Sequence, residues 1–396
     1  MSDAEPIVRI ASRGDGVTAG GRHAAMAAPG DLLEADGSVT PGPHHAKPLC
    51  RHFPDCGGCQ LQHVDDAAYA GYLFDRVSWA LTAQGIAPPE IRPAHLSPPR
   101  SRRRASLSGA RRGNGFQLGF KEEGSHRIVD MHECHILRPE LFALVAPLRQ
   151  LLSRLVGRQA ATVRLTLADQ GADVLIEGIE AEGLASAEAL TDFAQKHDLA
   201  RLAIDGGYGA ETRWEPEPVT VTLSGVPVNL PANSFLQAAE DGEAALIAAV
   251  REVVGEARAV ADLFAGLGTF ALALDRKVTA AEASRDAAMA LQAAAHRSRR
   301  PITVAHRDLY RAPFDPKELA AFDAVVLDPP RAGAQEQVKM LAQSTVPRIA
   351  YVSCNPPTFG RDAKILVDGG YRVDWARPVG QFRWSTHVEL VAAFVR

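Results

Sequence analysis

The chain has 396 residues, of which 46% are hydrophobic and 23% charged, the composition of a globular protein of two or three domains. Its 43 basic and 47 acidic residues give a net charge of −4, so overall charge offers no argument for a polyanionic partner. No run of about 18 apolar residues occurs and the start lacks a signal-peptide pattern, so we expect a cytoplasmic protein without a membrane span. Five cysteines in a chain of this size predict metal binding or chemistry rather than a disulfide scaffold.

Two regions precede the final third of the chain. Residues 1–48 alternate short apolar runs with Gly and Asp turns, which predicts a short N-terminal β module. Residues 49–231 mix helical and strand patterns, which predicts a central α+β domain. The helical patterns cover 65–85, 138–157 and 186–197, and the strand patterns cover 161–169, 172–178, 199–207 and 218–225.

Residues 232–396 alternate strand and helix patterns throughout, beginning with a strand that ends in "ADLFAG" and a helix expected from Thr269. This alternation predicts an α/β fold, a Rossmann-like doubly wound parallel sheet with helices on both faces. Only residues 379–387 separate the last two strands. Because this connection is too short for a crossover, we expect those two strands to be antiparallel.

A glycine-rich turn in "ADLFAGLGTF" (261–270) predicts a cofactor site at the carboxyl end of a strand. Glu282 follows Asp262 by 20 residues, where a carboxylate can accept hydrogen bonds from ribose hydroxyls. Ala271 occupies the last glycine position of the dinucleotide motif, which weakens that interpretation and leaves S-adenosylmethionine open. An ordinary strand-to-helix turn is the alternative.

Two further strands end in prolines, in "LDPPRAG" and "YVSCNP", so Asp328 and Cys354 are expected at the rim of the same cleft. Cys354 is either a small core residue or a nucleophile. A thiolate that adds to carbon 6 of a pyrimidine allows carbon 5 to accept the methyl group of a sulfonium donor. Glu389 in "HVEL" could then remove the hydrogen from carbon 5, although an ordinary strand residue is the alternative.

The other four cysteines are Cys50, Cys56, Cys59 and Cys134. Four thiolates suit zinc or a [4Fe–4S] cluster, and nearby histidines make zinc reasonable; unrelated free thiols are the alternative. Residues 92–112 hold seven arginines and no acid, and a second basic cluster covers 296–300. Such clusters predict local phosphate binding, with solvated loops as the alternative.

The ordered set of motifs resembles the bacterial RNA 5-methyluridine methyltransferases, in particular the iron–sulfur type that modifies 23S ribosomal RNA. The matching pieces, which span Cys50 to Leu390, are "CRHFPDCGGCQLQH", "NSFLQ", "DLFAGLGTF", Glu282, "LDPPRAG", "YVSCNP" and "HVEL". Departures are a short N-terminal module, expected to be a degenerate TRAM or OB-like barrel, Leu236 in place of an aromatic residue, and Phe264 without a hydroxyl group.

The resemblance implies a role for each candidate residue. Cys354 would be the nucleophile and Glu389 the base. The residues implied to line the S-adenosylmethionine site are Gln237, Phe264, Thr269, Glu282 and Asp328. The four residues Cys50, Cys56, Cys59 and Cys134 would bind a [4Fe–4S] cluster, with zinc as the less favoured alternative. The cluster would have a structural or RNA-positioning role.

The expected substrate is an unstacked uridine in a loop of RNA, reached by base flipping, and the expected protein is a monomer. Two alternatives stay open: the same chemistry on transfer RNA, which the four cysteines disfavour by resemblance, and a noncatalytic iron–sulfur RNA-binding protein.

Overall fold

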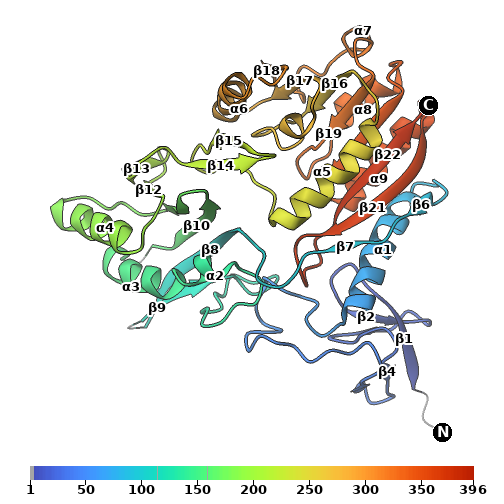
Figure 1. Ribbon diagram of the computed structural model, residues 1–396. Helices are drawn as coiled ribbons and strands as arrows, with labels where there is room; N and C mark the ends of the chain where they lie inside the picture. Colours follow the sequence, from blue (N-terminus) through green and yellow to red (C-terminus); the bar gives the residue numbers. More distant parts are fainter. Residues whose placement is uncertain (1–3, 114, 158) are drawn as a thin grey trace.

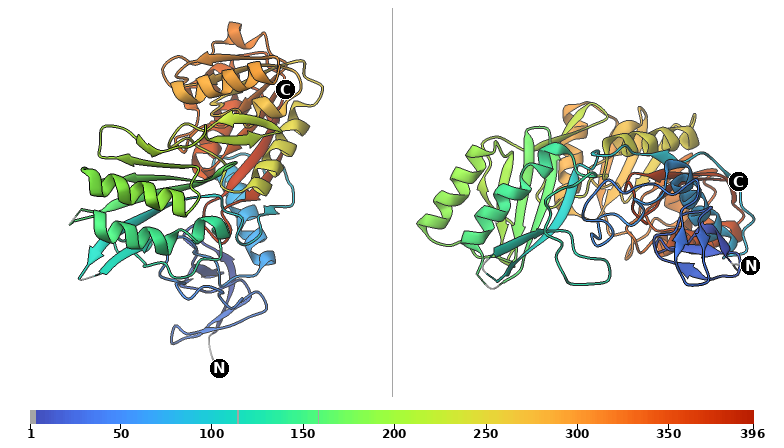
Figure 2. Two further views of the ribbon diagram at one scale, coloured as in Figure 1. Left: turned by 60° about the vertical axis from the view of Figure 1, so that its left-hand side comes forward. Right: turned by 90° about the horizontal axis from the view of Figure 1, so that it is seen from below.

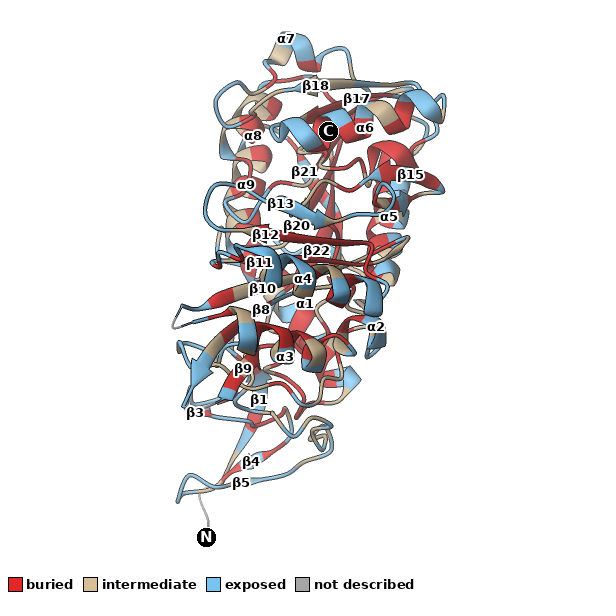
Figure 3. Ribbon diagram, turned by 90° about the vertical axis from the view of Figure 1, so that its left-hand side faces the viewer, coloured by how far each residue is buried: buried red, intermediate tan, exposed pale blue. Residues whose placement is uncertain are grey.

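The structure is a computed structural model that describes residues 4–113, 115–157 and 159–396. The three main sheets lie in three different places (Figures 1 and 2). In Figure 1 the central sheet is at the left, the C-terminal sheet is at the upper right and the N-terminal sheet is at the lower right, below the C-terminal unit. The buried residues gather in the strands and on the inner faces of the helices, while the outer helix faces are exposed (Figure 3).

The N-terminal sheet confirms the expectation of short strands in the first 48 residues, of which residues 1–3 lie outside the described chain. Its strands are β1 (Glu5–Ile10), β2 (Gly16–Thr18), β3 (His23–Ala24), β4 (Leu32–Leu33) and β5 (Val39–Thr40). They pair antiparallel in the order β3-β2-β1-β4-β5 over a small apolar cluster that includes Ile7 and Leu33. The OB-like character of this sheet stays a prediction.

The central sheet has the order β13-β12-β11-β10-β8-β9. Its strands are β8 (Arg104–Arg112), β9 (Gly115–Gly119), β10 (Ala161–Ala168), β11 (Gly171–Glu177), β12 (Arg201–Asp205) and β13 (Glu211–Trp214), and its helices are α2 (Pro139–Phe142), α3 (Val145–Leu155) and α4 (Leu184–Lys196). The pair β11–β12 is parallel and is joined through α4, while the other pairs are antiparallel. The helix expected over 138–157 is divided, because Pro147 has no N–H and occupies the first turn of α3.

The C-terminal sheet has the order β18-β17-β16-β19-β20-β22-β21-β6, with β7 also paired to β21. Its strands are β16 (Ala259–Leu263), β17 (Lys277–Glu282), β18 (Ile302–His306), β19 (Ala324–Leu327), β20 (Arg348–Ser353), β21 (Arg372–Gly380), β22 (Glu389–Val395), β6 (Glu90–Ile91) and β7 (His95–Leu96). Strands β16 to β20 pair in parallel and β22 runs antiparallel to both β20 and β21, which confirms the doubly wound sheet and its antiparallel final pair.

The helices of this unit are α1 (Asp66–Thr82), α5 (Glu240–Val254), α6 (Arg285–Arg297), α7 (Pro316–Leu319), α8 (Gln335–Ala342) and α9 (Pro356–Asp368). The prediction of a helix from Thr269 is wrong, because the structure has only a 3-10 turn there, η1 (Ala271–Ala273). Because β17 already begins at Lys277, the chain has no room for a full α-helix between the two strands.

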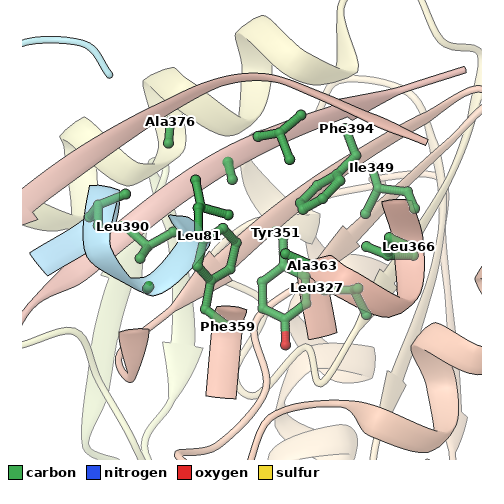
Figure 4. Close-up of a cluster of buried hydrophobic side chains, with 14 of the residues drawn as sticks. Leu81, Leu327, Ile349, Tyr351, Phe359, Ala363, Leu366, Ala376, Leu390 and Phe394 are labelled. Carbon is green, nitrogen blue, oxygen red and sulfur yellow. The ribbon is translucent and has the colours of Figure 1, made fainter. Parts of the chain in front are cut away.

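Part of the predicted central domain belongs to the C-terminal unit. Helix α1 packs on α9 and β21, and β6 and β7 extend the C-terminal sheet. Leu81 of α1 lies with Phe359, Tyr351 and Phe394 in one buried cluster (Figure 4). A Cβ at Gly360 would lie 2.2 Å from the Ala80 carbonyl oxygen, so this glycine permits the close approach of α1 to α9.

The hairpin of β14 (Thr220–Leu223) and β15 (Val226–Asn229) likewise packs against α6 and shares its core with the C-terminal sheet. The predicted domain of residues 49–231 is therefore divided in space. Its middle portion forms the central sheet, and its two ends cover the C-terminal one.

Candidate active site

The glycine-rich turn after β16 has the backbone conformation that its sequence predicts. Gly266 and Gly268 have φ angles of +54° and +94°, and Phe264 also has a positive φ of +65°. A Cβ at Gly268 would lie 2.3 Å from Leu291 Cδ1 of α6, so only glycine fits this position without displacing its neighbour. Asp262 accepts a hydrogen bond from the Ala271 N–H at 2.8 Å, which fixes the end of the turn.

Glu282, at the end of β17, lies directly beside this turn. Its carboxylate accepts the Gly266 N–H at 2.8 Å and the Ser284 N–H at 2.7 Å. These bonds hold both oxygens at the edge of the cavity and leave further lone pairs for a ligand. The position supports the expected ribose contact and adds a second role, because Glu282 also orders the cofactor loop.

A cavity of about 840 Å³ opens at the carboxyl ends of the parallel strands. The seven residues that the sequence assigned to catalysis or cofactor binding all line it: Gln237, Phe264, Thr269, Glu282, Asp328, Cys354 and Glu389. This is the place where open α/β sheets bind their ligands, and its volume suits a nucleoside cofactor.

The sheet topology brings the chemical residues together. Asp328 directly follows β19 and Cys354 directly follows β20, so both lie at the same edge. Since β22 is antiparallel to β20, with Leu390 paired to Ser353, its first residue, Glu389, reaches that edge too. A thiol and two carboxyl groups from three strands therefore face one cavity.

Burial raises the pKa values of Asp328, Glu389 and Cys354, and repulsion from neighbouring carboxyl groups adds to this effect for Glu389 and Cys354. Burial raises the pKa of Asp328 to about 7. Burial and the nearby Asp328 raise the pKa of Glu389 to about 8, against a hydrogen bond from Gln381 and the charges of Arg104 and Arg331. Burial, Glu389 and Asp328 raise the pKa of the Cys354 thiol to about 12, whereas Arg331 lowers it. Such shifts are typical of catalytic sites.

Part of the basic segment 92–112 is buried or lines the cavity, so the segment as a whole is not a solvated loop. Arg103 is 3% exposed, and its guanidinium forms an ion pair with Glu243 at 2.6 Å and donates to the Gln237 carbonyl oxygen. Arg102 and Arg104 line the cavity, and the Arg104 guanidinium lies 4.2 Å from the ring centroid of the exposed Phe235. Arg102 and Arg104, at and just before the start of β8, therefore form part of the cavity wall, an arrangement that the charge pattern did not reveal.

Several cavity residues escaped the sequence interpretation. The rings of Tyr310 and Phe264 make a tilted contact with centroids 5.6 Å apart, and His387 and Phe382 line the cavity from the loop before β22. His387 and Phe382 belong to the segment that ends in the recognised "HVEL", so the motif itself was the signal that could have found them.

The four remaining cysteines line a second pocket together with Phe120 and Glu133. Cys59 is buried, and burial raises the pKa of its thiol to about 12. Throughout residues 4–113, 115–157 and 159–396, no group of three or more His, Cys, Asp or Glu side chains is arranged to hold a metal ion. The structure thus gathers the four thiols that the sequence singled out, but it does not establish a metal centre.

The cysteine pocket is physically joined to the catalytic wall. The Gln60 and Leu61 N–H groups donate to the Trp384 carbonyl oxygen at 2.8 and 2.9 Å, only a few residues before Glu389. On the other side, the Arg102 N–H donates to the carbonyl oxygen of Ile136, which lines the cysteine pocket.

Comparison with known proteins agrees with this architecture. Residues 313–395 match the family model described as tRNA (Uracil-5-)-methyltransferase. An RNA methyltransferase of Zymomonas mobilis, named as uncharacterized, is 49% identical over 98% of this chain and 99% of its own length. The 23S rRNA (uracil(1939)-C(5))-methyltransferase RlmD of Chromohalobacter salexigens is 32% identical over 89% of this chain and 77% of its own length.

Among solved structures, the tRNA (uracil-54, C5)-methyltransferase of Pyrococcus abyssi, in complex with S-adenosyl-L-homocysteine, shares the fold with a TM-score of 0.74 and 24% identity. The alignment covers 99% of this chain and 100% of that one.

The doubly wound sheet, with its cavity at the carboxyl ends of the parallel strands, defines an α/β fold that this chain shares with a solved methyltransferase. Within that fold class, the chain belongs to the family of RNA (uracil-5-)-methyltransferases and is an RNA-modifying enzyme. In the described part of the chain, no helix has the length and apolar character needed to cross a membrane.

Proposed function

We propose that the protein methylates carbon 5 of a uridine in RNA, with 23S ribosomal RNA as its target, through a covalent bond between Cys354 and the uracil. The observation that carries this proposal is the cavity in which Cys354, Glu389 and the glycine-rich loop meet from distant parts of the sequence. The relationship to RlmD over most of the chain favours ribosomal RNA. The arginines of the cavity wall support an anionic substrate.

Cys354 starts the reaction. Its thiolate adds to carbon 6 of the uracil, which makes carbon 5 nucleophilic enough to take a methyl group. S-adenosylmethionine, when bound, would supply that methyl group from a positively charged sulfonium. Glu389 as carboxylate then removes the proton from carbon 5, and elimination breaks the Cys354–carbon 6 bond and restores the thiolate.

Before Cys354 can act as a nucleophile, its thiol must lose a proton. Because burial and two carboxyl groups raise the pKa of the thiol, the resting group is protonated at neutral pH. Arg331 opposes this shift, and a cationic methyl donor would oppose it further. A cationic methyl donor in the cavity would therefore increase the fraction of reactive thiolate.

For the four-cysteine pocket we propose a [4Fe–4S] cluster held by Cys50, Cys56, Cys59 and Cys134. Four thiols around one pocket fit the ligand set of such a cluster, which is wider than a metal ion and needs more widely spaced thiolates. No step of the methyl transfer needs an electron. The bonds from Gln60 and Leu61 to Trp384 support a structural role, in which the cluster holds the segment that carries Glu389.

Two active-site variants test the mechanism. Cys354→Ala is expected to abolish methylation, and Glu389→Gln is expected to accumulate a methylated RNA–protein adduct, visible as a slow band on a denaturing gel. Tyr208→Ala, a substitution at a side chain that is 99% exposed, is the control for handling and folding. Wild-type turnover by Cys354→Ala would refute the covalent mechanism, and normal product release by Glu389→Gln would refute the assignment of the base.

The target is tested by mapping 5-methyluridine in ribosomal and transfer RNA from cells with and without the gene. Loss of the modification from 23S ribosomal RNA alone is the expected result. Loss from transfer RNA, with 23S ribosomal RNA unchanged, would replace the proposed substrate with transfer RNA.

A further inference from the structure

Gln381 lies in the connection between β21 and β22 and is 1% exposed. It does not line the cavity, and its sequence context gave it no role. Its Oε1 accepts the Ala238 N–H at 2.8 Å and the Ala239 N–H at 3.4 Å. Because backbone N–H groups only donate, these two bonds determine which end of the Gln381 amide is oxygen and which is nitrogen.

The orientation of Gln381 dictates that of a second amide. Its Nε2 donates to Gln237 Oε1 at 2.7 Å, so Gln237 must present its oxygen to Gln381. The Gln237 NH2 group is thereby directed to Asp328, with Nε2 and Oδ2 3.3 Å apart. Both Gln237 and Asp328 line the cavity, whereas the residue that orients them lies behind its wall.

The same amide also reaches the proposed base. Gln381 hydrogen-bonds the Glu389 carboxyl group, and this bond lowers the pKa of Glu389 against the effect of burial. The other charged or ionisable groups that act on Glu389 are Asp328, Arg104 and Arg331, and Glu389 in turn acts on Cys354. One buried side chain thus contacts both the polar pair of the cavity and the carboxylate that completes the reaction.

We propose that Gln381 is a positioning residue for methyl transfer, which fixes the Gln237 amide with its NH2 toward Asp328 and holds Glu389 at the cavity. This inference rests on the proposed function for its effect on turnover. Its effect on cofactor binding does not depend on the RNA substrate.

The test replaces Gln381 with methionine, which has a similar volume and makes none of these hydrogen bonds. Gln337→Met is the matched control, because Gln337 is also 1% exposed and bonds the Phe314 backbone away from the cavity. We expect both variants to lose thermal stability. Only Gln381→Met should weaken S-adenosylmethionine binding, measured by calorimetry, and lower kcat, each by about tenfold for the lost buried hydrogen bonds.

Two further readouts separate positioning from packing. The pH at which kcat rises should move to higher values in Gln381→Met, because Glu389 loses a hydrogen bond that favours its carboxylate. In a double-mutant cycle that combines Gln381→Met with Gln237→Met, the two losses of cofactor affinity should be less than additive, since Gln381 acts through Gln237.

Equal cofactor affinity, kcat and pH profile in Gln381→Met and the wild-type protein would overturn the inference. So would additive effects in the cycle. If the wild-type protein does not methylate RNA but Gln381→Met still weakens cofactor binding, the proposed function fails and the orienting role of Gln381 stands.

Discussion

At Cys354, burial and two neighbouring carboxyl groups raise the pKa of the thiol to about 12, whereas Arg331 lowers it. The sequence placed this cysteine at the end of a strand but could not give its ionisation, which depends on side chains from β19 and β22. The Cys354 thiol is therefore protonated at neutral pH.

The rate at which iodoacetamide alkylates Cys354 tests the raised pKa of its thiol. The rate is expected to be low at pH 7 and to rise without a plateau to pH 9, because the thiolate fraction is still small there. Glu389→Gln should leave the rate unchanged below about pH 7 and increase it above pH 8, where the wild-type carboxylate would be charged; each unit of pKa corresponds to about a tenfold change. Arg331→Met should slow the reaction.

The modified peptide is identified by mass spectrometry, so that the other four cysteines do not contribute. Equal rates in the wild-type and Glu389→Gln proteins at pH 9 would contradict the proposed coupling between thiol and carboxyl group.

Among the elements, the glycine-rich turn was well predicted and the structure that follows it was not. The motif indicated glycines with unusual backbone angles, and Gly266 and Gly268 have them. No α-helix follows Thr269 because β17 begins soon afterwards, at Lys277. The local sequence pattern did not reveal how early that strand begins. Conversely, the second part of the arginine-rich segment forms strand β8, because its alternate apolar residues Ala105 and Leu107 enter the core of the central sheet.

Gly268→Ala tests the turn. A Cβ there would clash with the buried Leu291 side chain and force a strained φ, so the free energy of unfolding should fall by about 2–4 kcal/mol and cofactor binding should be lost. Gly266→Ala is the matched control, since a Cβ at that position meets nothing within 4 Å and only the φ angle is costly, by about 1–2 kcal/mol. Urea unfolding and calorimetry measure both. Similar losses in the two variants would show that the contact with Leu291 is unimportant.

At the scale of the whole molecule, the ends of the chain are interdependent. The loop with Cys56 and Cys59 bonds to Trp384, and α1 covers the sheet that holds the catalytic residues. The predicted division at residue 231 therefore fails as a spatial boundary, because packing joins segments that lie hundreds of residues apart.

Cys59→Ser tests this long-range link. If the cysteine site holds a cluster, the variant should lose iron, and amide hydrogen exchange should become faster over residues 382–389, since the bonds to Trp384 loosen. Exchange over 261–270 and the affinity for S-adenosylmethionine should stay unchanged. Cys354→Ser, which should keep its iron and its exchange pattern, is the control. Unchanged exchange over 382–389 in an iron-free Cys59→Ser protein would contradict the structural role.

The sequence by itself determined the doubly wound fold and the cofactor loop. Together with the family resemblance, it also named seven of the residues that meet in the cavity. Periodicity, glycine and proline positions, and the order of motifs are local properties of the chain and can be recognised without coordinates. Only the tertiary structure decided which arginines form the cavity wall, how Gln381 orients Gln237, and how far Cys354, Asp328 and Glu389 shift one another's ionisation. These features arise from burial and from contacts between distant strands, which no local pattern records.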